Sequence, residues 1–394
     1  MSDPIVILGS GLAGYTVARE FRKLDKETDL IVVSADDGCF YSKPMLSTAL
    51  AAGKTAAALA MKPAAAMAAE LNARIRPHAP VLSIDIAAGQ VRLADEVIAY
   101  SKLVLALGAD PIRLPLAGDA AGAGTRDSAG DGDGTRGVLA VNDLASYARF
   151  RERLAGRRRV AILGAGLIGC EFANDLVAGK YEVDVIDIAS QPLGRLLPAA
   201  LAEAMRVALA GAGVRWHLGR KTVAVQHAGD GYRIEFADGG SIETDLVLSA
   251  IGLAPRTALA QAAGLAVQRG ILVDNTLRTS APEVYALGDC AEINGAVLPF
   301  VLPIMHAARV LGPVLAGQSA GLRYPHMPVV VKTPAMPAVV CPAPAGTPGA
   351  WQIETVSDGL AARFVDSQGR VAGFALTGSA AAKRQHLLSE MAPA

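Results

Sequence analysis

Two stretches of the chain share one hydrophobic pattern. Each begins with four apolar residues, Ile5–Leu8 and Val160–Leu163, passes through a glycine-rich turn and continues into a segment with helical periodicity. A short apolar run that is rich in β-branched residues and bounded by glycine is typical of a strand buried on both faces. The pattern therefore predicts the same strand, turn and helix twice in one chain.

The two turns read GSGLAG and GAGLIG, with glycines at three matching positions. In such a turn the first glycine permits the tight bend, the second lets a pyrophosphate approach the backbone, and the third lets the helix pack on the strand. The free N–H groups at the start of the helix then face the anion. Each turn predicts a dinucleotide site, and the expected contact residues are Gly9, Ser10, Gly11, Leu12 and Gly14 in the first site and Gly164, Gly166 and Gly169 in the second.

The end of the next strand distinguishes the two sites. After the second helix, the strand Val183–Asp187 ends in an acid about twenty residues beyond the central glycine. The carboxylate of Asp187 can bind ribose hydroxyls and repel a 2′-phosphate, which favours NAD(H) over NADP(H). The corresponding strand of the first unit ends at Ser34, so its adenosine contact is left open between Ser34, the backbone at Ala35, and Asp36.

A third signal lies downstream, where a threonine-led turn enters a short strand that ends in Gly288 and Asp289. This run resembles the second flavin fingerprint of FAD-dependent pyridine-nucleotide oxidoreductases, in which the aspartate holds the ribityl chain. Two further runs, Leu103–Gly108 and Leu246–Gly252, resemble the segments by which that superfamily crosses between domains. The resemblance implies FAD in the first site, completed by Asp289, and NADH in the second.

The order of these signals predicts a discontinuous domain. The fold class is α/β, with two Rossmann-like dinucleotide-binding domains of the three-layer FAD/NAD(P)-binding type and a small α+β domain. The expected FAD domain comprises residues 1–112 and 243–322, and the NAD domain comprises 113–242. Residues 118–137 are nearly all glycine, alanine and polar, which predicts a flexible loop. Residues 323–394 are expected to form short strands and a final helix.

Composition excludes several other classes of protein. Of the 394 residues 52% are apolar and 19% are charged, which is typical of a globular protein rather than a disordered one. The 37 Lys and Arg residues balance the 37 Asp and Glu residues, so charge gives no indication of nucleic acid or a membrane surface. No signal peptide or membrane-spanning stretch is expected, and we predict a cytoplasmic protein.

The cysteines limit the redox chemistry. Cys39, Cys170, Cys290 and Cys341 are scattered, with no paired spacing that would indicate a disulfide exchange motif or a metal cluster. No metal site is expected, and dithiol chemistry is excluded as the step that follows flavin reduction. A single-cysteine oxidase or peroxidase would need a thiol beside the flavin, for which Cys39 is the candidate. We favour packing roles for the cysteines, so the electrons are expected to leave the flavin directly.

Three short runs make the resemblance more specific. They look like bacterial NADH:rubredoxin reductases, and the similarity extends along the chain apart from residues 118–137. The resemblance implies an enzyme in which a hydride passes from NADH to flavin N5 and two single electrons then pass to rubredoxin, supporting alkane hydroxylation or defence against peroxide and oxygen. The three runs are FYSKPMLS at 40–47, GCEFAND at 169–175 and VKTPA at 331–335.

The same resemblance assigns roles to individual residues. Lys43 resembles a lysine beside flavin N5, and Glu171 resembles the carboxylate that pairs with it across the nicotinamide pocket. Lys332 resembles a second lysine near the N1–C2 edge of the flavin. The backbone of Val81 is expected to meet the adenine, and that of Val301 is expected to meet the flavin.

Two alternatives stay open at this point. Reductases of a ferredoxin or of a flavorubredoxin share every motif used so far. A protein of another class, an FAD- and NAD-responsive binding protein of the apoptosis-inducing-factor type, would be expected to carry targeting or basic DNA-binding segments, and none is visible in the sequence.

Overall fold

The computed structural model describes residues 3–114 and 137–391, and it divides into two compact units. The first unit comprises residues 1–43, 58–110 and 253–324, and the second comprises 44–57, 111–252 and 325–394. Each passage from the first unit to the second falls at a proline, namely Pro44, Pro111 and Pro325. Proline fixes its own φ, so the first residue of each passage has little backbone freedom.

The first unit is built on a parallel five-stranded sheet in the order β21-β9-β1-β2-β5. Its central strand β1 is the apolar run that the sequence predicts, and its side chains alternate between two cores. Ile5 and Ile7 enter one core, whereas Val6 and Leu8 enter the core on the other face. The sheet strands are β1 (Ile5–Leu8), β2 (Leu30–Val33), β5 (Arg74–Arg76), β9 (Lys102–Leu105) and β21 (Val284–Ala286).

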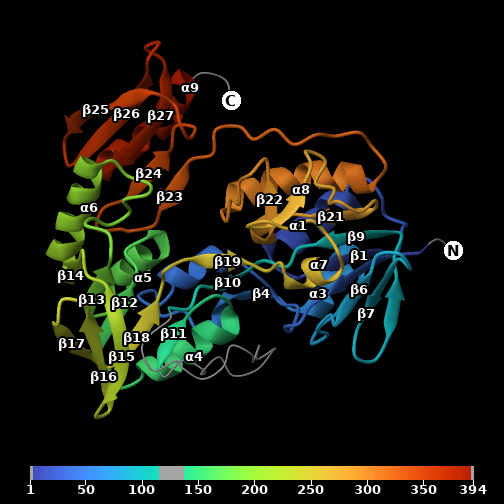
Figure 1. Cartoon of the computed structure of the whole chain (residues 1–394), viewed down its shortest axis with the longest axis horizontal. Coiled ribbons are helices and arrows are strands. Elements are labelled where there is room, and N and C mark those ends of the chain that lie inside the picture. Colours follow the sequence, from blue (N-terminus) through green and yellow to red (C-terminus); the bar gives the residue numbers. More distant parts are fainter. Residues whose placement is uncertain (1–2, 115–136, 392–394) are drawn as a thin grey trace. The chain divides into compact units, whose positions relative to one another are not determined.

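Two helices cover one face of this sheet, α1 (Leu12–Arg22) and α8 (Val301–Leu315), and Figure 1 shows them on the same side of the unit. They cross closely at Gly312, where a Cβ atom would lie 2.7 Å from Cβ of Glu20. A second close approach occurs at Gly288, whose φ is +81° and where a Cβ would lie 2.8 Å from Cβ of Ala13. The packing therefore brings the Gly288–Asp289 turn to the start of α1.

Smaller elements complete the first unit. A three-stranded antiparallel sheet contributes Ile84, Val91 and Ile98 to the core on the opposite face from α1. The remaining elements, some of which end at a unit boundary, are β3 (Phe40–Tyr41), α2 (Ala56–Leu59), β4 (Ala60–Lys62), α3 (Ala64–Leu71), β6 (Ser83–Asp85), β7 (Gln90–Arg92), β8 (Val97–Ala99), β10 (Ala109–Pro111), β19 (Leu253–Pro255), α7 (Ala258–Ala262), β20 (Ile271–Val273) and β22 (Ala291–Ile293).

The second unit repeats the plan with a parallel sheet in the order β11-β18-β12-β13-β14. A three-stranded antiparallel sheet packs on one of its faces, and the shared core includes Ile186, Ile234 and Val247. The elements are β11 (Val138–Ala140), α4 (Leu144–Leu154), β12 (Arg159–Leu163), α5 (Leu167–Ala178), β13 (Glu182–Asp187), α6 (Ala199–Ala212), β14 (Val214–Leu218), β15 (Thr222–Ala228), β16 (Gly231–Phe236), β17 (Ser241–Thr244) and β18 (Leu246–Ser249).

The unit boundaries differ from the expected domain boundaries in three places. Residues 325–394, which we expected as a separate C-terminal domain, belong to the second unit. The return to the first unit occurs at Leu253 rather than near residue 243, because β18 pairs with β12 and so belongs to the second sheet. The segment 44–57, which we expected in the FAD domain, belongs to the second unit. Of the loop expected at 118–137, residues 118–136 lie outside the described part of the chain.

The C-terminal segment folds as the sequence predicts, with its own antiparallel sheet in the order β23-β24-β27-β26-β25 and its own core around Phe374 and Leu387. The expected final helix is preceded by a 3-10 turn at Gly378–Lys383 and so begins at Arg384. The elements are β23 (Val329–Val331), β24 (Ala338–Cys341), β25 (Gly349–Val356), β26 (Gly359–Asp366), β27 (Val371–Thr377) and α9 (Arg384–Glu390). The predicted α/β fold class is confirmed.

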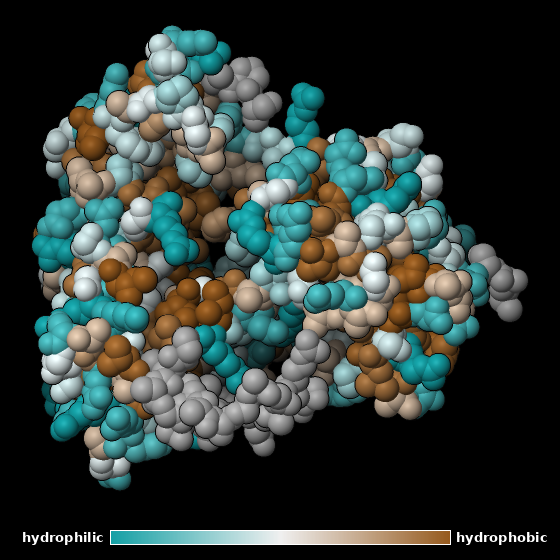
Figure 2. Space-filling model, in the orientation of Figure 1, coloured by the Kyte–Doolittle hydropathy of each residue, from teal (hydrophilic) through white to brown (hydrophobic). Residues whose placement is uncertain are grey.

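Among the described residues, none of the helices is long and apolar enough to cross a membrane. Polar and apolar residues are interspersed over the face seen in Figure 2. Large exposed apolar side chains, such as Met61, Leu82 and Ile188, come from different parts of the chain.

A buried carboxylate connects two strands of the second sheet. Asp184 on β13 accepts hydrogen bonds from Nε and Nη2 of Arg215 on β14, at 3.0 and 2.6 Å. His217 Nε2 lies 2.8 Å from Oδ1 of the same carboxylate, and its ring stacks on Phe236. Burial raises the pKa of Asp184, but His217 and Arg215 more than offset this effect and lower the pKa to about 2.

Replacing this carboxylate should destabilise the second unit in a pH-dependent way. Because the pKa of Asp184 is depressed on folding, its contribution is present above its unfolded pKa of about 3.9 and is lost as pH falls through about 2. Asp184→Asn should therefore lower the free energy of unfolding by about 2 kcal/mol at pH 7. The difference between the variant and the unaltered protein should shrink below about pH 4. Denaturant titrations across this pH range measure the effect. Glu243→Gln, which removes an exposed ion pair with Arg233 in the same unit, should change the free energy of unfolding by less than about 1 kcal/mol. A stability loss in Asp184→Asn that did not change with pH would contradict the assignment.

Candidate dinucleotide-binding sites

The first glycine turn has the geometry of a pyrophosphate cradle. Gly9 has a φ of +118°, and a Cβ there would lie 2.2 Å from the carbonyl oxygen of Ala106. At Gly14 a Cβ would lie 1.9 Å from the carbonyl oxygen of Gly9, so the helix can only pack here without a side chain. At Gly11, by contrast, a Cβ would meet nothing within 4 Å. This open side of Gly11 lies at the start of α1, where backbone N–H groups can donate hydrogen bonds to an anion.

The second turn reproduces this geometry. Gly164 has a φ of +107°, and a Cβ there would lie 2.6 Å from the carbonyl oxygen of Ala250. A Cβ at Gly169 would lie 1.9 Å from the carbonyl oxygen of Gly164, and one at Gly166 would again meet nothing within 4 Å. Two turns with the same two close contacts and the same open central glycine fit two dinucleotides.

Asp36 organises a hydrogen-bond network beside the first glycine turn. Oδ1 of Asp36 accepts hydrogen bonds from Ser10 Oγ at 2.9 Å, from Ser34 Oγ and from the Gly38 backbone N–H at 2.9 Å. The sequence left Ser34, Ala35 and Asp36 as alternatives, and the structure joins two of them, Ser34 and Asp36, to Ser10 of the glycine turn in one network. The backbone N–H of Ala79 donates to the Ser34 carbonyl at 2.8 Å, two residues before Val81. The adenosine contacts of Ser34, Ala35 and Val81 themselves stay predictions.

The corresponding position of the second site is occupied by Asp187. Its Oδ2 accepts a hydrogen bond at 2.6 Å from the N–H of Ala165, which lies between the first two glycines of the turn. Its Oδ1 accepts one at 2.8 Å from the N–H of Ala189. The carboxylate is thus fixed beside the turn, with lone pairs left over for ribose hydroxyls.

Asp289 is the next residue after Gly288, which packs closely against Ala13 of α1. Burial raises the pKa of Asp289, and the nearby positive charge of Lys43 acts in the opposite direction. Val301 is the first residue of α8 and is 39% exposed, so its backbone is at a helix start where N–H groups are free to donate.

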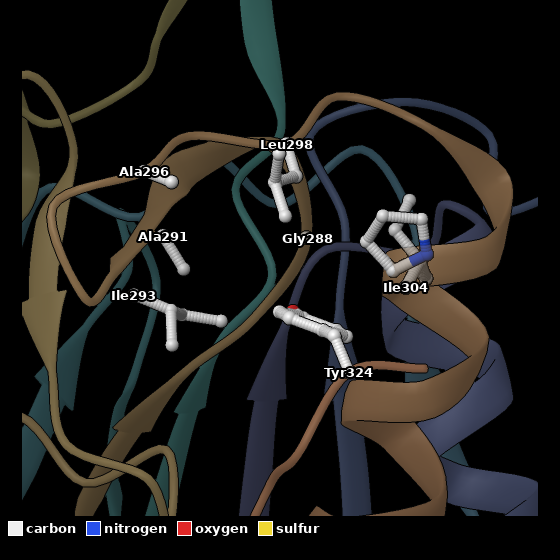
Figure 3. Close-up of a pocket in the computed structure, with 8 residues that line it drawn as sticks. Gly288, Ala291, Ile293, Ala296, Leu298, Ile304 and Tyr324 are labelled. Atoms are coloured by element: carbon white, nitrogen blue, oxygen red, sulfur yellow. The ribbon is translucent and has the colours of Figure 1, made fainter. Parts of the chain in front are cut away.

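A pocket adjoins the Gly288 turn and was not foreseen from the sequence. Figure 3 shows Ile293, Ile304 and the ring of Tyr324 among its lining residues. Burial raises the pKa of the Tyr324 hydroxyl to about 12. The residues that line it are mainly apolar.

Glu171 is fully buried and forms an ion pair inside the second unit. Lys332 Nζ lies 3.0 Å from Oε2 of Glu171, and the backbone N–H of Lys332 donates to Oε1 at 3.0 Å. Ser47 Oγ donates to Oε2 at 2.5 Å. Lys332 Nζ also donates to the carbonyl oxygen of Pro44. Lys43 belongs to the first unit, so its expected pairing with Glu171 stays a prediction.

Sequence reasoning missed three polar residues of this region. Asp175, one helical turn after Glu171, accepts hydrogen bonds from the N–H groups of Leu50 and Ala51 at 2.8 and 3.1 Å. Asn174 accepts one from the N–H of Ala335 at 3.0 Å. Together with Ser47, these residues lie inside the three runs that resemble NADH:rubredoxin reductases. The runs themselves were therefore the available signal, although they did not indicate which of their residues meet.

Two dinucleotide cradles, one ending in a flavin-type Gly-Asp turn and the other in an acid suited to NAD(H), define a flavin- and nicotinamide-dependent oxidoreductase. A model of the pyridine nucleotide-disulphide oxidoreductase family matches residues 3–311, and a model of the rubredoxin binding C-terminal domain matches residues 321–391. The chain therefore belongs to the pyridine nucleotide-disulphide oxidoreductase family. Members of this family use FAD with NADH as substrate, and the same holds for this chain.

Individual relatives match over nearly the whole length. The chain is 48% identical to rubredoxin-NAD(+) reductase from Alcanivorax borkumensis, covering 98% of each chain. It is 39% identical to nitric oxide reductase FlRd-NAD(+) reductase from Aeromonas salmonicida, covering 96% of this chain and 94% of the relative. Among solved structures, a ferredoxin reductase from Rhodopseudomonas palustris superposes with a TM-score of 0.86 at 25% identity, covering 100% and 96% of the two chains.

The position of Asp187 predicts the choice of coenzyme. We expect NADH to be preferred over NADPH by about 10- to 1,000-fold in kcat/KM, because a 2′-phosphate would meet this carboxylate. Asp187→Asn should narrow the ratio, since the amide keeps an acceptor for the Ala165 N–H but removes the charge. Asp238→Asn, an exposed acid elsewhere in the same unit, should leave the ratio unchanged. Steady-state kinetics with both coenzymes measure this, and equal use of the two by the unaltered enzyme would contradict the assignment.

The ion pair predicts a specific pattern of stability changes. Lys332→Met leaves a buried carboxylate without its cation and should lower the free energy of unfolding by about 2 kcal/mol, less than a fully buried pair because the Lys332 side chain is 36% exposed. Glu171→Gln in the same protein should recover part of this loss. Lys383→Met, which removes a distant surface contact to Glu354, serves as the control. Strictly additive effects of the two core substitutions in denaturant titrations would show that the pair is not coupled.

Proposed function

We propose that this protein is an NADH-dependent flavoenzyme that transfers electrons to rubredoxin. The observation that carries the proposal is the match of residues 321–391 to the rubredoxin binding C-terminal domain, attached to a core with two dinucleotide cradles. The relative with 48% identity is a rubredoxin-NAD(+) reductase, which supports the same acceptor. We also propose a cytoplasmic location, since all four cysteines are free and this is typical of reducing compartments.

The cysteines support direct transfer from the flavin. All four lie in the described part of the chain, and all are buried and free. Burial raises the pKa of each of these thiols, to about 11 for Cys290 and Cys341. A thiol that resists ionisation is a poor nucleophile and a poor redox group. No cysteine of the chain is therefore suited to relay electrons, although the family is named for disulfide substrates.

The residues present would hold the two dinucleotides as follows. The N-terminus of α1, with Gly11, would bind the FAD pyrophosphate, and Asp289 would bind the ribityl chain. The N-terminus of α5, with Gly166, would bind the NADH pyrophosphate, and Asp187 the adenosine ribose. When bound, the flavin would supply the ability to accept two electrons as a hydride and to release them one at a time.

The contribution of the chain to this chemistry is alignment and charge. Hydride transfer needs stacked rings and no side-chain acid or base, so positioning is the main requirement. We assign Lys43 and Lys332 to stabilising the negative charge of the reduced flavin, and Glu171 to holding Lys332 in place. The backbones of Val81 and Val301 are assigned to adenine and flavin contacts.

A second carrier has one supporting observation. The relative with 39% identity is named for the flavorubredoxin of a nitric oxide reductase, so a rubredoxin-like domain of a larger protein is the alternative acceptor. The higher identity to the free-standing rubredoxin reductase favours rubredoxin itself. The ferredoxin reductase that superposes on this chain is 25% identical to it, so the comparison supports a ferredoxin less than it supports rubredoxin. The enzymatic relatives do not favour a binding protein of the apoptosis-inducing-factor type.

Reductive titration and turnover test the proposal together. Dithionite should reduce the purified enzyme with about two electrons per FAD, because no disulfide takes up a further pair. NADH oxidation should be slow alone and should accelerate on addition of rubredoxin. Cys39→Ser should leave this rate largely intact. Uptake of about four electrons, or loss of turnover in a folded Cys39→Ser protein, would instead indicate thiol chemistry.

A further inference from the structure

Helix α5 carries three buried polar side chains on one face. Glu171, Asn174 and Asp175 stand at positions i, i+3 and i+4, so their side chains are neighbours on the helix surface. They are 0%, 7% and 5% exposed. A buried polar group is costly unless it is hydrogen-bonded, so this face must receive partners from other segments.

The partners come from two segments that are far apart in sequence, 44–57 and 332–335. In each segment, backbone N–H groups bind one polar side chain of the helix and one residue reaches Glu171. The first is anchored through the N–H groups of Leu50 and Ala51, which donate to Asp175, and it brings Ser47 to Glu171. The second is anchored through the N–H of Ala335, which donates to Asn174, and it brings Lys332 to Glu171.

Ser47 has a particular place in this arrangement. Its buried hydroxyl donates to Oε2 of Glu171 at 2.5 Å, the same oxygen that Lys332 Nζ contacts at 3.0 Å. Lys332 Nζ is also 3.4 Å from Ser47 Oγ, so the hydroxyl accepts from the ammonium group while it donates to the carboxylate. The hydroxyl therefore touches both members of the ion pair. Its removal would leave the carboxylate with one donor fewer and the ammonium group with one acceptor fewer.

We propose that Ser47 is a positioning residue for the Glu171–Lys332 pair in the reaction with NADH. This inference rests on the proposed function, in which NADH binds at the N-terminus of α5 and Lys332 stabilises the reduced flavin. Glu171 lies in the second turn of α5, five residues after Gly166. The carboxylate is thus carried by the helix that binds the coenzyme, and Ser47 fixes its rotamer and the direction of Lys332 Nζ.

The role assigned to Ser47 predicts an effect on rate rather than on coenzyme affinity. The adenosine and pyrophosphate contacts of NADH involve the glycine turn and Asp187, which Ser47 does not touch. A small displacement of charged groups at a reacting centre is sufficient to slow a reaction considerably. Ser47→Ala should therefore slow the reduction of bound flavin by NADH at saturation by about tenfold, with little change in the dissociation constant of NAD⁺.

Stopped-flow bleaching of the flavin by NADH, without any electron carrier, measures this rate in the holoenzyme. Ser47→Thr keeps the hydroxyl and should restore most of the rate. Thr48→Ala serves as the matched control, because Thr48 is the adjacent residue and, among the described residues, its hydroxyl donates to the Met45 carbonyl rather than to Glu171. An unaltered rate in Ser47→Ala would overturn the proposal, and so would equal losses in Ser47→Ala and Thr48→Ala.

Reductive methylation followed by mass spectrometry gives a readout that does not depend on activity. In Ser47→Ala the Lys332 amine should be methylated faster relative to Lys23, whose side chain is 65% exposed and which belongs to the first unit. Unchanged Lys332 labelling would overturn the proposal. If the unaltered enzyme is bleached by NADH but does not reduce rubredoxin, the proposed acceptor fails while the result for Ser47 stands.

Discussion

A fully buried carboxylate must have its charge compensated, and this requirement organises the second unit around Glu171. The desolvation of an unpaired ion costs several kcal/mol, so Glu171 can be buried only where a cation and further donors meet it. Lys332 supplies both an ammonium group and a backbone N–H, and Ser47 supplies a hydroxyl. Glu171 on α5 therefore holds two segments, 44–57 and 332–335.

The N-terminus of α5 and the rest of the helix make different kinds of contact. At its N-terminus Gly166 provides no capping side chain, so the first N–H groups are left for an anionic ligand. One and two turns later, Glu171 and Asp175 accept hydrogen bonds from other segments and fix the helix in place. An uncapped terminus can be retained in this way because the stability of α5 comes from its packing and its buried partners.

Much of the fold was predictable because its signals are local. The two glycine turns and the C-terminal strands follow from short-range patterns, and the observed strands lie within a few residues of the predicted ones. The unit boundary lies at Leu253 rather than near residue 243 because β18 pairs with β12, a contact that the local sequence pattern does not reveal. The pairing of Glu171 with Lys332 joins residues 161 positions apart, and spacing carries no information about such a contact.

The boundary at Lys43 and Pro44 shows how local chemistry and long-range contacts combine. Lys43 is the last residue of the first unit, and it begins the 3-10 turn Lys43–Thr48 that continues into the second unit. The carbonyl of Pro44 accepts a hydrogen bond from Lys332 Nζ, the same group that pairs with Glu171. The peptide that follows Lys43 is thus held from the second unit by the ion pair. Lys43, which we assign to the flavin, is thus followed directly by a residue that is bound to the ion pair on α5. The backbone at Pro44 is consequently held in place through Lys332 and Glu171.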